Sequence, residues 1–373
     1  MTAAKKKTAE PPSTEPEHVP FDWHTYGLMA EFKDSLKQDP FYDLEEAKKE
    51  GTIERSDEVS CENRGQLAQY ASELLNHQHR THTFQIFVVQ DFVRFIYWDR
   101  AGAVVSAKFN YVEEPTTLAE FFWRYNHMSA ERRGWDASVS EPSDADVELF
   151  RKTVKAFVGA MADVSNRQRR IERAEHTLDE DYPPYKMTVG AVKTGDTQDV
   201  IIQKPFEVCR SPAGRATRAY LAYSLTEQRL VFLKDSWRVA VMDLSDEDSI
   251  YFKLIEENVP HIPRVLCAGD VVVDGVVQET QTQALAQKSA AEWWVPCSSS
   301  RRHQHHRILQ DLAYPLWTAA NSQEYTEAFR DAFISASYFF SILPTCAHVD
   351  GQPWKAQRRR EFYIEISAST TSC

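Results

Sequence analysis

Lys234 is the residue whose type and position raise the first chemical question. It follows the run Arg229 to Leu233, whose Leu, Val and Phe residues are typical of a half-buried strand. Strand alternation places the lysine on the same face as Leu230 and Phe232. Burying an ammonium without a counter-charge is costly. Therefore either the strand lies at a solvated sheet edge or an anion meets this lysine, and the residues alone favour the edge interpretation.

The elements predicted around Lys234 follow a definite order. Strands are predicted in DVIIQKPFEVC, ATRAYLAYSL and RLVFLKDSW, then a helix in DEDSIYFKLIEENV, then strands in RVLCAGDVVVDG and HHRILQDLAY. The amino-terminal lobe of a protein kinase has this order. There, a turn between the first two strands covers the phosphates, the third strand carries a phosphate-binding lysine, and a glutamate of the helix holds it. Glu247 lies in the predicted helix and is suited to that role.

The sequence also resembles the fungal-type protein kinase family from about Arg64 to Asp331. The resemblance is carried by FVRFIYWDRAGAVVSAKFNY, LAEFFWRYNHMSAERRGWDASV, GRATRAYLAY, VFLKDSWR, IPRVLCAGDV and HHRILQDLAYPLW, with WDRAG and KDSWR the most distinctive parts. It implies a kinase fold preceded by a family-specific α+β region, and ATP with Mg as the cofactor. It also implies that Lys234 positions the phosphates and that Glu247, or alternatively Asp248, holds the lysine.

The candidate nucleotide-binding residues lie in the turn, on the lysine strand and its helix, and after the last strand. The turn GRATRAY has a single glycine, so its backbone amides approach a phosphate closely at only one point. The resemblance implies that the connection to the second lobe, near Asp311, meets the adenine through its backbone. The candidate cofactor-binding residues are therefore Lys234, Glu247, Gly214, Arg215, Thr217 and Asp311.

The sequence departs from the kinase pattern where catalysis is expected. A kinase needs a catalytic-loop aspartate, an asparagine and an Asp-Phe-Gly aspartate. After SQEYTEAFRDAF, the tripeptide His348-Val349-Asp350 has valine where arginine is expected, and no Asp-Phe-Gly follows. We therefore expect a truncated second lobe, no catalytic residue and little or no phosphotransfer; the alternative is a pseudokinase-like module that binds a protein. The apolar stretch SASYFFSILP predicts a protein partner that covers the exposed lobe.

Composition excludes several other classes of protein. The chain has 373 residues and a net charge of −12, which argues against a nucleic-acid partner. Its six cysteines lie far apart, and the histidines of 77–82 and 303–306 have no acids or cysteines at ligand spacing, so we predict no disulfide framework and no metal site. No stretch has the length to span a bilayer or the pattern of a signal peptide. We expect no membrane association and an intracellular location, in the cytoplasm or the nucleus.

The predicted fold class is α+β, divided into six segments. They are a disordered tail (1–20), a family-specific N-terminal α+β domain (21–164), a charged linker (165–188), a kinase-like N-lobe with an antiparallel sheet and one helix (189–312), the first helices of the C-lobe (313–340), and a divergent tail expected to be disordered (341–373).

Overall fold

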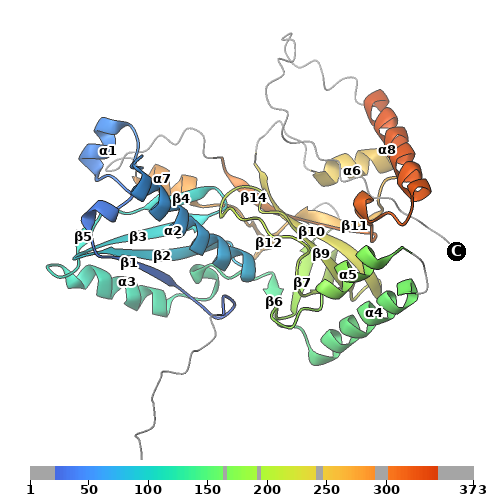
Figure 1. The fold of residues 1–373 in the computed structure, drawn as a ribbon, viewed down its shortest axis with the longest axis horizontal. Coiled ribbons are helices and arrows are strands. Elements are labelled where there is room, and N and C mark those ends of the chain that lie inside the picture. The colour runs from blue at the N-terminus through green and yellow to red at the C-terminus, as the bar shows by residue number, and fades with distance from the viewer. Residues whose placement is uncertain (1–21, 163–165, 191–194, 241–246, 290–300, 343–373) are drawn as a thin grey trace, which may run out of the picture.

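The computed structural model describes residues 22–162, 166–190, 195–240, 247–289 and 301–342. Figure 1 shows two parts side by side, each built on a sheet. The N-terminal part contains a five-stranded sheet, and the second part contains a seven-stranded sheet. A short hairpin of β12 (Val272–Val273) and β13 (Val276–Val277) lies apart from both sheets.

The N-terminal sheet is covered by helices on both faces. Its elements are β1 (Met29–Lys33), η1 (Leu36–Gln38), α1 (Leu44–Glu50), α2 (Glu58–His77), β2 (His82–Val89), β3 (Phe92–Asp99), β4 (Gly102–Val105), β5 (Phe109–Asn110), α3 (Pro115–His127) and η2 (Glu131–Arg133). Neighbouring side chains of a strand point to opposite faces. Phe87 of β2 therefore packs with Leu67 of α2, whereas Val88 packs with Phe121 of α3. β1 pairs with β2 in parallel, and the other pairs are antiparallel.

The seven-stranded sheet is antiparallel in every pair, with the order β11-β14-β10-β9-β8-β7-β6. Its strands are β6 (Val139–Ser140), β7 (Tyr185–Gly190), β8 (Thr197–Ile202), β9 (Arg218–Ser224), β10 (Arg229–Val239), β11 (Val265–Asp270) and β14 (His303–Gln310). The sheet curls, because β7 also contacts β11 and β14. The curled sheet encloses an inner core that contains Met187, Val231, Leu233 and Leu309.

The helices of the second part lie on the outer face of the curled sheet or beside it. They are α4 (Asp144–Ala162), α5 (Gln168–His176), α6 (Glu247–Glu256), α7 (Thr282–Ser289), η3 (Leu316–Thr318) and α8 (Ser322–Ile342). α4 and α5 pack over β8, β9 and the start of β10 through an apolar cluster that includes Phe150, Leu221 and Leu230. α6 contacts β11, α7 reaches back to β3 and β4, and α8 contacts η3 (Figure 1).

The predicted α+β class, with an antiparallel kinase-like sheet and one helix between its third and fourth kinase-like strands, β10 and β11, is confirmed. The division into segments differs in detail. The expected linker, 165–188, contains α5 and the start of β7, because Ile171 and Ala174 form a buried apolar face between the charged residues. β6 belongs to the lobe sheet although it precedes that linker. The tails 1–20 and 341–373 lie outside the described residues, apart from the last two residues of α8.

Candidate functional site

Lys234 lies on a central strand and has an anionic partner. β10 pairs with β9 on one side and β14 on the other, so the interpretation of Lys234 as a solvated edge lysine is wrong. Its Nζ atom lies 2.8 and 3.0 Å from the two carboxylate oxygens of Glu247, at the start of α6. The side chains of Lys234 and Glu247 are 17% and 30% exposed. The ammonium is therefore neutralised without being sealed from solvent, and a phosphate has access to it.

The predicted glycine turn approaches Lys234 but directs its one glycine amide elsewhere. Gly214 has φ +103°, and its N–H donates to the carbonyl of Arg100 at 2.8 Å. In the kinase pattern G-x-G-x-x-G-x-V, Ala216 and Ala219 stand where the second and third glycines would be, and Leu221 stands where the valine would be. Ala216 has φ +42°, a conformation that favours glycine. The small residues at these positions follow the spacing of the kinase pattern, and a search for glycines alone does not find them.

Arg215 and Thr217, the other predicted turn residues, lie at the surface. The guanidinium of Arg215 lies 3.7 Å from the carboxylate of Glu247. The backbone carbonyl of Arg215 accepts a 2.7 Å hydrogen bond from the Trp237 amide of β10. The Thr217 side chain is exposed. We call Gly214, Arg215, Lys234 and Glu247 the phosphate end of the site, because these residues bring two cations and one anion to one place on the outer face.

The N-terminal part holds the turn in place. Arg100, which is 1% exposed, donates from its guanidinium to the carbonyls of Pro212 at 3.2 Å and Leu75 at 3.1 Å. The side-chain amide of Asn76 on α2 donates to the carbonyl of Cys209. Because both donors come from the N-terminal sheet and helix, the position of the turn depends on a part of the chain more than 100 residues away.

Asp99, the neighbour of Arg100 in WDRAG, fixes a second element. Its carboxylate accepts hydrogen bonds from the amides of Gln281 at 2.7 Å and Thr282 at 2.9 Å, and from the Thr282 hydroxyl at 2.7 Å. The first N–H groups of a helix have no partner within the helix, so a carboxylate is favoured at this end of α7. Asp99 also accepts a hydrogen bond from the Ala101 amide at 2.8 Å in its own turn, so one carboxylate stabilises the turn and joins the two parts of the chain.

KDSWR contributes a buried charge cluster on the inner face, opposite Lys234. The carboxylate of Asp235 accepts from Arg218 at 2.6 Å and Arg307 at 3.1 Å, and it contacts the His305 ring. Arg307 also donates to Asp136 at 2.8 Å. Burial alone would raise the pKa of Asp235, but the nearby His305, Arg218 and Arg307 hold it well below its usual value. This carboxylate is thus an ionised structural centre of the lobe.

A second polar cluster supports α6. Asp270 accepts from Arg238 at 2.8 and 2.6 Å and contacts Nδ1 of His306 at 3.0 Å. Burial opposes ionisation of Asp270, but the hydrogen bonds from His306 and Arg238 lower its pKa to about 2. His306 Nε2 lies 3.7 Å from Asp248 of α6. Asp248, the alternative partner of Lys234, therefore faces β14, while Glu247 meets the lysine.

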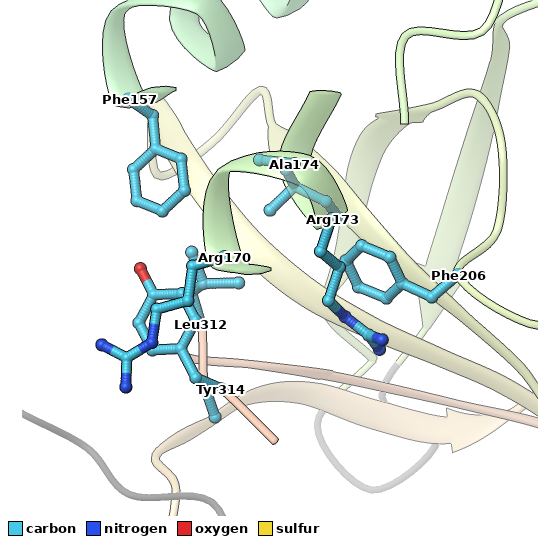
Figure 2. Close-up of a pocket in the computed structure, with 9 residues that line it drawn as sticks. Phe157, Arg170, Arg173, Ala174, Phe206, Leu312 and Tyr314 are labelled. Atoms are coloured by element: carbon cyan, nitrogen blue, oxygen red, sulfur yellow. The ribbon is translucent and has the colours of Figure 1, made fainter. Parts of the chain in front are cut away.

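The other end of the outer face is filled by side chains. Asp311 pairs with Arg229, and the connection that follows it lies under α5. Figure 2 shows the residues around the remaining space, which is a cavity of about 20 Å³. It is lined by Phe157, Arg170, Arg173, Ala174, Phe206, Leu221, Leu312, Ala313 and Tyr314. We call Leu221, Leu312 and Tyr314 the base end of the site, since they lie where the resemblance places the adenine.

The described residues fit ATP with Mg at the phosphate end only. Lys234 and Arg215 suit phosphate oxygens, whereas a cavity of about 20 Å³ has room for about one water molecule and not for a purine. No group of three or more potential metal ligands occurs among the residues that the structure describes. The tripeptide His348-Val349-Asp350 lies outside them. In the described ranges, no helix is long and apolar enough to cross a membrane.

A curled antiparallel sheet with a lysine on its third kinase-like strand and a glutamate partner on the following helix defines a protein-kinase-like nucleotide lobe. The chain belongs to the fungal protein kinase family, whose model matches residues 30–340. Comparison with curated proteins and with solved structures finds no significant match.

Proposed function

We propose that this chain provides the nucleotide lobe of a protein kinase, in which Lys234 and Glu247 position the phosphates of Mg-ATP for transfer to protein serine or threonine hydroxyls. The observation that carries the proposal is the ion pair between Lys234 Nζ and Glu247, at 2.8 and 3.0 Å. A lysine held in this way presents its charge at a fixed point. When bound, Mg-ATP would supply the γ-phosphoryl group; the chain's own residues bind and orient it.

Little or no phosphotransfer by this chain alone is part of the proposal. The kinase reaction needs an aspartate near the hydroxyl and metal-binding acids. The sequence offers His348-Val349-Asp350 in place of the catalytic loop, without an Asp-Phe-Gly motif. An intracellular location, where ATP and protein substrates are available, belongs to the same proposal.

Replacing Lys234 with Met tests the proposal. Mg-ATP is expected to raise the melting temperature of the parent chain and to leave that of Lys234→Met unchanged, because the phosphates lose their fixed cation. Lys253→Met is the matched control, since Lys253 is an exposed lysine on α6. Equal shifts in Lys234→Met and the parent chain would remove the lysine from the site.

A protein-binding module is the second candidate function, and one surface favours it. Three aromatic side chains that recur every four residues on α8 are substantially exposed: Tyr325 (46%), Phe329 (42%) and Phe333 (66%). Their spacing places them along one side of the helix. Substituting Phe329 and Phe333 with Ser would weaken binding of a protein partner while leaving any Mg-ATP shift intact, whereas Lys234→Met would do the reverse.

A further inference from the structure

If the phosphates of a nucleotide contact Lys234, its base can lie in only one direction along the outer face of the sheet. On one side of the lysine stands Glu247 of α6, and on the other the face continues along β10 to Phe232. Phe232 pairs across the sheet with Leu221. Apolar side chains are what a flat aromatic base requires. On its other side Phe232 pairs with Gln310, and Leu312 packs against the cluster that contains Leu221, so the base end lies next to the phosphate end on one surface.

α5 occupies this strip. Ala174, which is 3% exposed, belongs to the same apolar cluster as Leu221, and Leu312 packs against that cluster. Figure 2 shows Phe157 of α4, Ala174 of α5 and Leu312 around the cavity. The volume left, about 20 Å³, accommodates about one water molecule. A purine therefore enters only if these helices move.

Polar contacts hold α5 in place beside its apolar face. Arg170, which is 3% exposed, places its guanidinium 4.3 Å from the centre of the Tyr314 ring and forms an ion pair with Glu324 at the start of α8. Its Nε atom lies 3.4 Å from the Thr318 hydroxyl. Arg169 donates to the carbonyl of Trp317 at 2.8 Å. Ion pairs and single hydrogen bonds can be exchanged for water or a ligand, so this arrangement is suited to opening.

We propose that α5 is an autoinhibitory element that occupies the base end of the nucleotide site, and that Mg-ATP binds only to molecules in which α5 has moved away. The inference rests on the proposed function, because it requires the phosphate end to bind a nucleotide. The Arg170–Glu324 ion pair is the latch, and Ala174 is the part of α5 that covers Leu221. Any factor that breaks the latch then increases nucleotide affinity.

Two substitutions open the latch from opposite elements. Arg170→Ala removes the cation on α5, and Glu324→Gln removes the anion on α8. Each is expected to tighten Mg-ATP binding, measured by calorimetry, by about tenfold, because affinity rises with the fraction of molecules in the open state. Arg151→Ala is the matched control, an exposed arginine on α4 that is expected to leave affinity unchanged. Adding Lys234→Met to Arg170→Ala is expected to remove the gain.

Hydrogen exchange at the amides of 312–314 reports separately whether α5 has opened. Faster exchange together with tighter Mg-ATP binding in both latch variants supports the proposal. Faster exchange with unchanged affinity, in a parent chain that does bind Mg-ATP, overturns autoinhibition and leaves the proposed function standing. Faster exchange with no Mg-ATP binding by any variant at millimolar concentration overturns both. Glu324→Gln keeps the test valid if Arg170→Ala fails to fold.

Discussion

The phosphate end and the base end lie on the same face of one sheet, yet they differ in openness. At the phosphate end, Lys234 and Glu247 form an ion pair that solvent still reaches, and Arg100 anchors the turn from another part of the chain. At the base end, Ala174 and Leu312 pack around a cavity of about 20 Å³. An assembled lysine–glutamate pair does not by itself make a nucleotide site, because the neighbouring apolar strip must also be free for the base.

The buried charge cluster lies on the inner face of the same sheet, and breaking it has the largest expected effect. Asp235→Ala leaves Arg218 and Arg307 buried without their shared carboxylate. We expect the free energy of unfolding to fall by about 3–5 kcal/mol, as urea denaturation would measure. Asp91→Ala, at an exposed turn, is the control. A loss below about 1 kcal/mol would contradict the structural role given to this cluster.

Arg100→Met is expected to affect the phosphate end without affecting the base end, and its effect on stability is intermediate. The carbonyls of Pro212 and Leu75 lose their donor, so stability is expected to fall by about 1–3 kcal/mol. The turn loosens, and Mg-ATP affinity is expected to fall about tenfold, while exchange at 312–314 stays at the parent level. Arg132→Met, an exposed arginine, is the control. Faster exchange at the base end would show that the two ends are not independent.

Acid is expected to open the base end, with the smallest effect. Burial opposes ionisation of Glu324, but hydrogen bonds from the Ala320 amide and Arg170 lower its pKa below the ordinary 4.5. A lowered pKa means that the carboxylate stabilises the closed state fully above pH 4.5 and that this contribution is lost as pH falls through the lowered value. Hydrogen exchange at the amides of 312–314, corrected for its intrinsic pH dependence, gives the free energy of opening. We expect this free energy to be lower by about 1 kcal/mol in acid. Glu324→Gln should show no such change.

The sequence contained enough to predict that Lys234 and Glu247 meet. Alternation along β10 placed Lys234 on the face of Leu230 and Phe232, and the order of elements located Glu247 on the following helix. The same alternation puts Asp235 on the opposite face with Leu233, which is how it enters the inner side of the sheet. These features depend on residues close together in the chain, where periodicity is informative.

The base end was harder to predict. The charges of NRQRRIERAEH favoured a linker, although Ile171, Ala174 and Leu178 have the spacing of one helical face and mark α5 as a buried helix. The roles of Asp99 and Arg100 had no local signal beyond the hairpin. Their partners, Thr282 and Pro212, are more than 100 residues away, and only the folded structure brings them together.

Comparing Mg-ATP with Mg-tripolyphosphate, which has the phosphates but no base, tests most directly whether α5 occupies the base end. If α5 closes the base end, Arg170→Ala should tighten Mg-ATP binding about tenfold and leave Mg-tripolyphosphate binding unchanged, because only the ligand with a base requires α5 to move. A parent chain that binds Mg-ATP far more tightly than tripolyphosphate, with Arg170→Ala unchanged, would contradict the claim that α5 occupies the base end.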